Sequence, residues 1–420
     1  MKNKQILEDL NKALIPALGC TDPVSIAYAA SCARDSNPGN ELRSISLKVS
    51  GGLIKNAAAV YIPNTDLVGI TYAAVLGVMI NDPSLEMQLL SKVDEELVER
   101  TRQYVQANTV MIEAVDYDHL FIQVDVETDL GRSTSIIDHE YTHLAYLRFN
   151  DVVLYEDKRD PSLNINKPNY TIQEIIDFAK TIPLDQLDKV KQAIRMNRYF
   201  CQHKDEQSHE MGVGNRLHQE SKGHIWLEII SQTAGSSDAR MAGSGNPVMS
   251  NSGSGNQGLL TILPILLMSD SLNVDEQTQL RACALSAAVM MTIKKKFGLM
   301  SGICSAVVAS CGTAAGLTFL QTQDESKIKL AIHNIIANVS GIHCDGAKTS
   351  CALKVSTCTF AALTSSSLAL SDEGVSVEHG YIEENIEDTI DHLAALSRIS
   401  KGETDQKIIE IITCKQRQTK

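Results

Sequence analysis

The order in which strand-like and helix-like segments follow one another is the feature that most constrains this chain's fold. Up to residue 150, segments such as SISLKV and LFIQVDVET alternate in polarity as strands do, and helical stretches are predicted over 66–82 and 94–108. Beyond residue 150 the strand signal almost vanishes, and helical patterns rich in alanine and other small residues continue to about residue 413. The sequence therefore predicts an α+β protein, with a smaller mixed N-terminal part (1–150) and a larger, mostly helical domain (151–420).

The boundary between these parts is predicted in DKRDPSLNINKPNY, which follows Asn150 and is polar and proline-bearing. Strand-like patterns also occur at 57–62 and 133–149. An N-terminal helix pair is predicted at 3–17 and from Asp22 to Arg34, and this pair, which carries Cys20, is expected to pack on the helical domain. Helices of the second part are predicted at 171–182, 184–204, 224–234, 256–268, 275–297, 301–320, 325–340, 350–370 and 381–413.

Composition limits the class of protein. The formal net charge of −13 argues against a general nucleic-acid binder, which would normally carry a basic patch. The N-terminus reads as an amphipathic helix rather than a signal peptide, and the longest strongly apolar run, Gly258 to Met268, is too short to span a bilayer. We therefore expect a cytoplasmic protein that binds neither nucleic acid nor membrane.

The cysteines indicate metal or redox chemistry, because the chain has ten of them and no export signal. Cys344 and Cys351 lie in GIHCDGAKTSCALKV, where the intervening Asp-Gly favours a turn that lets the two thiols converge. Cys304 and Cys311 are seven positions apart in a helical pattern, as are Cys351 and Cys358, which places the members of each pair roughly 10 Å apart along a helix. At most one member of each helical pair is therefore expected to hold a compact cluster. Cysteine-held zinc is not favoured, because its usual spacing of two to four residues never occurs.

Cys20 lies just before the predicted start of the second helix, where backbone N–H groups and the helix dipole favour a thiolate. It is a candidate base, nucleophile or metal ligand, with a packed turn cysteine as the alternative. Cys414 is expected to face the core from the last helix, or else to fold back and cap a metal site. The remaining cysteines are expected to be small buried hydrophobes, namely Cys32, Cys201, Cys283, Cys311 and Cys358.

The glycine–serine loop, MAGSGNPVMSNSGSGNQG at 241–258, offers many backbone N–H, hydroxyl and amide donors. It runs into an apolar helix, so its end resembles a helix N-terminus that receives a carboxylate. The loop matches neither a Walker A motif nor a dinucleotide-binding GxGxxG. A flexible linker is the alternative interpretation.

HEYTH, formed by His139 to His143, formally matches the zinc-protease motif HExxH. That motif works only on a helix, whereas the flanking segments here are strand-like, so we expect a chance match. His343 and Lys348 flank Cys344 and are candidates to orient substrate or move protons, with an ordinary loop role as the alternative. The lysine run 294–296 is expected to be a solvated helix end.

The chain resembles the L-cysteine desulfidase family, which is related to the iron–sulfur L-serine dehydratases. The resemblance covers nearly the whole length and rests on ALGCTDP (17–23), RMAGSGNPVMSNSGSGNQG (240–258), SGICSAVVASCG (301–312) and CDGAKTSCALKV (344–355). It implies a [4Fe–4S] cluster held by Cys304, Cys344 and Cys351, and a catalytic role for Cys20. Asp22 stands where glutamate is common in the family, which leaves the substrate open.

The resemblance implies a lyase that converts L-cysteine to hydrogen sulfide, ammonia and pyruvate, with Cys20 removing the Cα proton. Alternatives are an L-serine dehydratase with the same cluster, a non-catalytic iron–sulfur sensor, a zinc protease through HEYTH and a metal-free anion-binding protein. Family precedent and the small-residue helices favour a homodimer. The residues expected to bind the amino-acid substrate are Ser250, Asn251, Ser252, Ser254, Gly255 and Asn256, with Lys348 as a further candidate.

Overall fold

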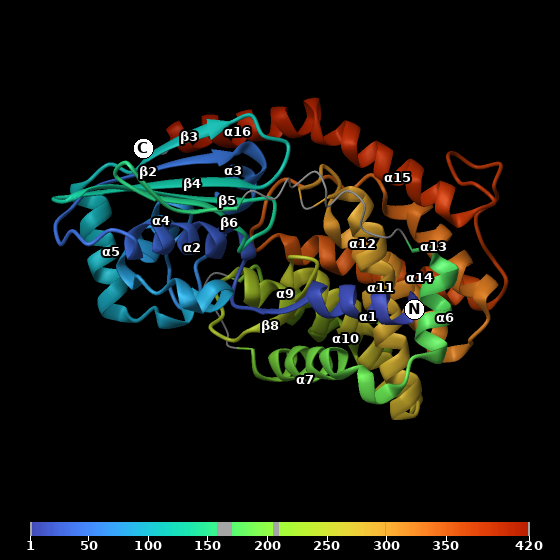
Figure 1. Ribbon diagram of the computed structural model, residues 1–420. Helices are drawn as coiled ribbons and strands as arrows, with labels where there is room; N and C mark the ends of the chain where they lie inside the picture. The colour runs from blue at the N-terminus through green and yellow to red at the C-terminus, as the bar shows by residue number, and fades with distance from the viewer. Residues whose placement is uncertain (1, 158–169, 205–209, 299, 419–420) are drawn as a thin grey trace.

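The computed structural model describes residues 2–157, 170–204, 210–298 and 300–418, and its fold is α+β, as predicted. A mixed sheet with helices on one face lies beside a bundle of helices (Figure 1). Nearly all of the predicted connection at 157–170 lies outside the described residues. The division of the chain at residue 150 into two domains stays a prediction.

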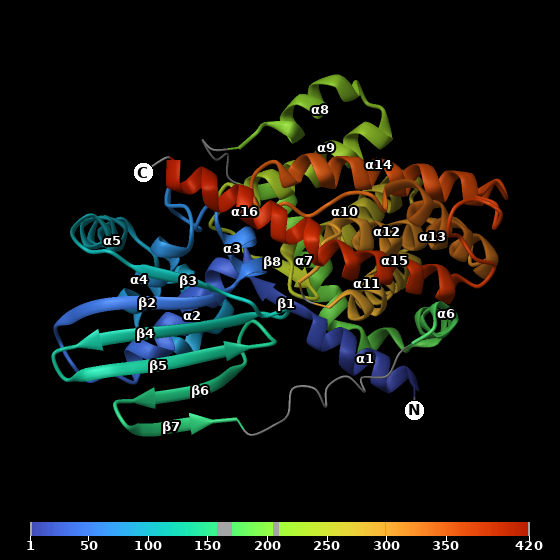
Figure 2. The same cartoon turned by 90° about the horizontal axis from the view of Figure 1, so that it is seen from above.

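The larger sheet has six strands in the order β3-β2-β4-β5-β6-β7, which Figure 2 shows from above. Neighbouring strands are antiparallel except β2 and β3, which are parallel. Alternate residues of β4, Ile122, Val124 and Val126, are fully buried in one hydrophobic core with α2 and α4, which cover one face of the sheet. The elements of this part are α2 (Thr21–Asp35), β2 (Leu42–Ser50), α3 (Gly51–Ala57), α4 (Ile70–Ile80), η1 (Pro83–Lys92), α5 (Glu95–Ala107), β3 (Met111–Val115), β4 (Phe121–Thr128), β5 (Gly131–Asp138), β6 (Leu144–Phe149) and β7 (Val152–Glu156).

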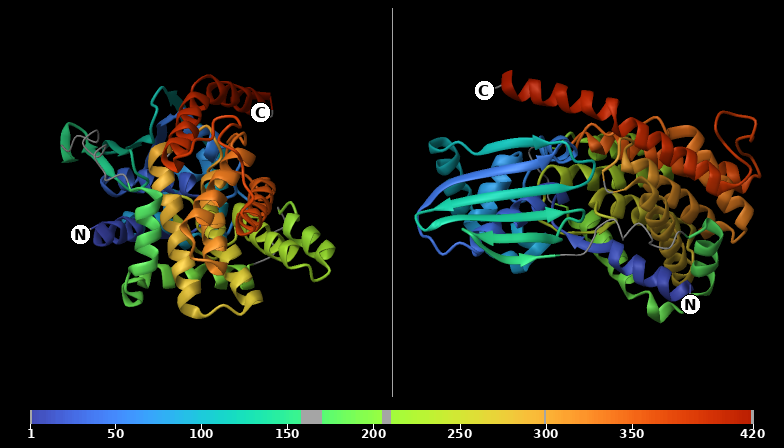
Figure 3. Two further views of the ribbon diagram at one scale, coloured as in Figure 1. Left: turned by 90° about the vertical axis from the view of Figure 1, so that its right-hand side faces the viewer. Right: turned by 45° about the horizontal axis from the view of Figure 1, so that its top comes forward.

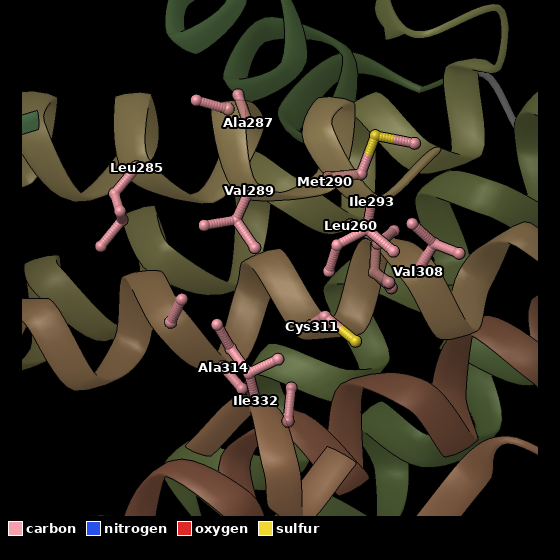
Figure 4. Packing of buried hydrophobic residues seen from close by; sticks show 14 of the residues in the cluster. Leu260, Leu285, Ala287, Val289, Met290, Ile293, Val308, Cys311, Ala314 and Ile332 are labelled. Atoms are coloured by element: carbon pink, nitrogen blue, oxygen red, sulfur yellow. The ribbon is translucent and has the colours of Figure 1, made fainter. Parts of the chain in front are cut away.

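The helical part is built around α12 (Ser305–Gln321), which contacts α10, α11, α13 and α14. Small side chains let these helices approach closely, and Figure 4 shows Cys311 among the apolar residues between them. Cys32, Cys201, Cys283, Cys311 and Cys358 are all buried, which confirms the expectation for these five. The other elements here are α6 (Ile172–Thr181), η3 (Leu184–Gln186), α7 (Asp188–His203), α8 (Val213–Ser221), α9 (Ile225–Met241), α10 (Gly255–Leu272), α11 (Glu276–Phe297), α13 (Glu325–Val339), α14 (Cys351–Leu370) and α15 (Ile386–Lys401).

The N-terminal segment differs from its predicted form. The helix α1 (Lys2–Ala13) ends early, and Leu14–Ala17 forms strand β1, antiparallel to β8 (Val248–Asn251) in the glycine–serine loop. Pro16 is disfavoured inside a helix, and the pairing with β8 explains why the chain is extended here. The helix α1 contacts α6 and α11, whereas α2 packs on the sheet. The strand predicted at 57–62 is wrong, because α3 ends at Ala57 and only Tyr61 makes a single bridge, to Val68.

The helix predicted over 381–413 is two helices, because the chain breaks at Gly402. The second, α16 (Glu403–Gln418), leaves the bundle and extends toward the sheet (Figure 3). A buried ion pair, Lys55 Nζ to Asp405 Oδ1 at 2.7 Å, holds α16 against α3. Cys414 lies exposed on α16, so the expectation that it faces the core is wrong. Among the described residues, no helix is long and apolar enough to cross a membrane.

Candidate functional site

Two paired loops bring Cys304 and Cys344 side by side. The backbone N–H of Cys304 donates to Ile342 O at 2.8 Å, and that of Cys344 donates to Gly302 O at 2.9 Å. Ile303 and His343 form an antiparallel bridge between these two hydrogen bonds. Burial and then the neighbouring Cys344 raise the pKa of the Cys304 thiol, which lies at the N-cap of α12. The sequence suggested neither this pairing nor its geometry.

A turn then carries the chain from Cys344 to Cys351, the first residue of α14. Gly346 at its centre has φ +94°, and a Cβ there would lie 2.1 Å from Lys55 O, so only glycine fits. Lys348 holds the turn through Asp345 Oδ1 at 2.8 Å. Cys351 is close enough to Cys304 to raise the pKa of the Cys304 thiol further. The structure thus brings the three predicted ligands together, and all three are half-buried.

Cys20 lies next to this group, in a small apolar cluster with Val60 and Met241 on which Cys351 packs. Cys20 is itself the N-cap of α2, which begins at Thr21, one residue before the predicted start, so Asp22 is the second residue of the helix. The Cys20 Sγ donates to Asp22 Oδ2 at 3.6 Å. Burial, followed by the charge of Asp22, raises the pKa of the Cys20 thiol far above its ordinary value. Burial also raises the pKa of Asp22, to about 6.

Arg240, at the end of α9, is a buried cation in this site. The sequence analysis assigned it no role. Its Nη2 donates to Gly19 O at 2.6 Å and its Nη1 to Asn256 Oδ1 at 3.1 Å. Among the described residues, no ion pair involves Arg240, and its Nε has no hydrogen-bond partner. Burial lowers its pKa, while Cys20, Cys351 and Asp22 oppose that shift. The sequence signal that could have indicated the burial of Arg240 is its position inside a run of small residues.

The glycine–serine loop is ordered structure rather than a linker. Ser250 Oγ donates to Ile15 O at 2.6 Å, Asn251 Nδ2 donates to Ala287 O at 3.1 Å, and Ser252 Oγ donates to Asn251 Oδ1 at 3.0 Å. Ser254 caps α10 without a side-chain hydrogen bond to the helix. Gly255 follows, and a Cβ there would lie 2.2 Å from Arg240 Nε. Ser254, Gly255 and Asn256 are therefore the part of the loop that adjoins Arg240, and the substrate role of all six residues stays a prediction.

Lys294 contradicts the expectation of a solvated lysine run. Its side chain is buried beside the cysteines, and its Nζ donates to Ser305 Oγ at 3.1 Å. Burial lowers its pKa to about 8, although the nearby Cys344 and Cys304 act in the opposite direction. Three successive lysines on a helix span about 200°, since each residue turns by about 100°, so they do not all share one face.

Tyr141 is a third residue of the site that the sequence analysis missed. The HEYTH segment forms the turn between β5 and β6 and not a helix, so the helical zinc-protease motif is absent from it. His143 Nε2 lies 2.8 Å from Asp157 Oδ2 instead. The Tyr141 side chain points toward Thr21 and Asp22, and burial together with the charge of Asp22 raises its pKa well above the usual value.

A hollow of about 320 Å³ lies between α16 and the turn after Cys344. Lys55, Asp345, Ala347, Lys348 and Lys415 are among its lining residues. Lys348 therefore lies at an opening beside the turn that carries the cysteines. His343, the other candidate of this turn, contacts Ser400 through its Nδ1 at 3.1 Å.

Comparison with known proteins places the chain in a family. A family model described as the serine dehydratase alpha chain matches residues 84–410. A protein of Bacteroides thetaiotaomicron named "UPF0597 protein" is 32% identical, over 99% of this chain and 98% of its own length. Proteins of the same name from Porphyromonas gingivalis and Clostridium perfringens are each 30% identical, over 98% of both chains in the first case and 99% of both in the second.

Proposed function

Because the chain belongs to the serine dehydratase alpha chain family, we propose that it is an iron–sulfur lyase that eliminates hydrogen sulfide from L-cysteine. One observation carries the proposal: Cys351, one of three half-buried thiols that lie together, adjoins a buried arginine that lacks an ion pair among the described residues. The thiols suit a metal cluster, and the arginine suits the carboxylate of an amino acid. Either feature alone fits many proteins, and their juxtaposition fits an amino-acid lyase.

The donor set fits a [4Fe–4S] cluster. Cys304 and Cys351 stand at helix starts, where the helix dipole favours a thiolate, and backbone N–H groups of Ala306 and Lys348 donate to their sulfurs. Lys294 is a buried positive group beside them. When bound by Cys304, Cys344 and Cys351, the cluster would supply an iron with an open position that acts as a Lewis acid.

The chain's own residues bind the substrate and move its proton. Arg240 binds the carboxylate through Nε, with Asn256 holding the guanidinium in place at 3.1 Å. The neighbouring cation Arg240 favours the thiolate form of Cys20, and this thiolate removes the Cα proton of the substrate. The Cβ–S bond breaks, sulfide leaves, and the resulting aminoacrylate hydrolyses to pyruvate and ammonia.

The choice of cysteine over serine rests on the surroundings of Cys20. Val60 and Met241 form an apolar cluster with Cys20, and Ala347 packs on it. An apolar surface of this kind accepts a thiol at less cost than a hydroxyl, which must keep a hydrogen bond. L-serine is the second candidate substrate, and the family match favours it.

The test is anaerobic purification with iron and sulfide analysis, followed by separate assays with L-cysteine and L-serine. We expect about four iron atoms per chain and a higher kcat/KM for L-cysteine, measured as sulfide and pyruvate release. A higher kcat/KM for L-serine would reassign the protein as a dehydratase. An iron-free protein from strictly anaerobic cells would end the cluster hypothesis.

A further inference from the structure

A second group of metal-ligating side chains lies at one end of the six-stranded sheet. His119 precedes β4, Asp138 ends β5, and His139 follows directly. His119 Nε2 and His139 Nδ1 each lie 3.0 Å from Asp138 Oδ1. One ligand atom from each of the three residues lies within 4.8 Å of the other two. Two loops at the same end of the antiparallel pair β4–β5 thus present two imidazoles and one carboxylate to the same point.

Two of these atoms make no hydrogen bond of good geometry among the described residues. Asp138 Oδ1 and His139 Nδ1 are buried, and neither has a hydrogen-bond partner among the described residues, although they face each other at 3.0 Å. A buried polar atom without a partner costs about 1–3 kcal/mol, so native proteins normally satisfy it with a group or an ion. The two imidazole rings stack with centroids 4.0 Å apart, which holds the two histidines together at this point.

The spacing agrees with a metal ion. Ligand atoms about 2.0–2.1 Å from zinc, at angles between about 90° and 109°, lie about 2.9–3.4 Å from one another. The two measured separations of 3.0 Å fall in that range. The other ring nitrogen of His119, Nδ1, lies 3.1 Å from Asp118 Oδ1. A carboxylate behind a ligating histidine fixes its orientation in many metal sites.

We propose that His119, Asp138 and His139 bind one divalent transition-metal ion, with zinc as the best match, at a site separate from the cysteines. Two imidazoles and a carboxylate leave a position for water, as in other three-ligand sites. The ion clamps the β3–β4 connection to the β5–β6 turn. Tyr141 lies on that turn and points into the catalytic site, and Ser25 Oγ holds its backbone carbonyl at 2.6 Å. The clamp therefore fixes a wall of the catalytic site.

The test is equilibrium dialysis of the anaerobically purified full-length enzyme against ZnCl₂ at buffered free zinc concentrations. We expect wild type to bind one equivalent of zinc with an affinity at least tenfold higher than that of Asp138→Asn or His139→Gln. Asp118→Asn is expected to weaken binding by about tenfold. His379→Gln, which changes an exposed histidine elsewhere, is the matched control and is expected to keep the wild-type affinity.

X-ray absorption at the zinc edge separates this site from thiol binding. The spectrum of wild type loaded with one equivalent is expected to show only nitrogen and oxygen ligands, with imidazole scattering. Sulfur ligands in that spectrum, or equal zinc affinity in wild type and Asp138→Asn, would overturn the proposal. Should Asp138→Asn fail to fold, judged by circular dichroism, the spectrum of wild type decides by itself.

Discussion

The cysteine loops and the glycine–serine loop lie on two sides of one site and differ in how their polar atoms are engaged. The sulfurs of Cys304 and Cys351 receive backbone N–H groups, an arrangement that stabilises a thiolate and leaves lone pairs for a metal. The side chains of Ser250 and Asn251 instead donate to backbone carbonyls of β1 and α11. A polar side chain that the fold already uses is poorly placed to bind a ligand. The comparison therefore favours the end of the loop, beside Arg240, over its middle as the proposed carboxylate site.

Replacing the proposed cluster ligands has the largest expected effect. Cys304→Ala, Cys344→Ala and Cys351→Ala should each lose nearly all iron and all activity, because a cluster held by three thiolates does not survive the loss of one. Iron per chain, measured after anaerobic purification, checks this. Cys311→Ala is the control, since Cys311 is buried in the helical core and should leave the iron content unchanged. Full iron in any one ligand variant would remove that residue from the set.

Cys20→Ala should separate catalysis from cluster binding. The variant is expected to keep its iron and to lose roughly 10²–10⁴-fold in kcat, the usual contribution of a general base. Pyruvate release under saturating substrate measures the loss. A variant with near-normal kcat would exclude Cys20 as the base, and one without iron would place Cys20 among the ligands.

Arg240→Lys tests the carboxylate side of the comparison. Lysine keeps the positive charge but loses the planar donor groups of arginine. The activation free energy should therefore rise by about 2–4 kcal/mol, which lowers kcat/KM roughly 30- to 1,000-fold. Arg281→Lys is the matched control, because Arg281 donates to the backbone carbonyls of Ala179 and Ile182. That change should lower stability without a comparable change in kcat/KM. Equal kinetic effects in the two variants would argue that Arg240 acts only through the fold.

Local patterns were readable from the sequence where local chemistry decides the structure. The helices predicted at 275–297 and 325–340 agree closely with α11 and α13, because Asp275 and Asp324 cap them with side-chain hydrogen bonds. The turn between Cys344 and Cys351 was likewise visible in its Asp-Gly pair. By contrast, β1 and β8 are strands of four residues whose partners lie more than two hundred positions apart, so neither carries a local signal.

The site residues that escaped prediction share a different cause. Arg240 and Lys294 are charged side chains buried by tertiary packing, and sequence statistics place such residues at the surface. Their burial becomes intelligible only when the thiols and Asp22 are seen around them. The glycine–serine loop was predicted to bind an anion, with a flexible linker as the alternative. Which of its side chains serve the fold was visible only in the hydrogen bonds of the structure.

Asp22→Asn should show that the buried carboxylate costs stability. The pKa of Asp22 is about 6 in the folded chain against an ordinary 3.8, so the folded state holds the proton more tightly than the unfolded state does. The stabilisation that the protonated Asp22 gives to the folded state is therefore fully present below about pH 4. It is lost as pH rises through about 6, which lowers the free energy of unfolding by about 3 kcal/mol. The unfolding free energy of wild type, relative to Asp22→Asn, should fall by that order between pH 4 and pH 7 in urea titrations. A pH-independent difference would contradict the raised pKa.

The smallest expected effects come from two serines of the glycine–serine loop, one that serves the fold and one that lies beside Arg240. Ser250→Ala removes the hydrogen bond from β8 to Ile15 O and should cost about 1 kcal/mol of unfolding free energy. Ser254 makes no side-chain capping bond, so Ser254→Ala should cost less stability and raise KM more than Ser250→Ala does. Urea unfolding and steady-state kinetics on both variants give the two comparisons. A larger rise in KM for Ser250→Ala than for Ser254→Ala would instead favour a carboxylate site in the middle of the loop. The Ser250 hydroxyl would then have to leave its hydrogen bond to β1 when the substrate binds.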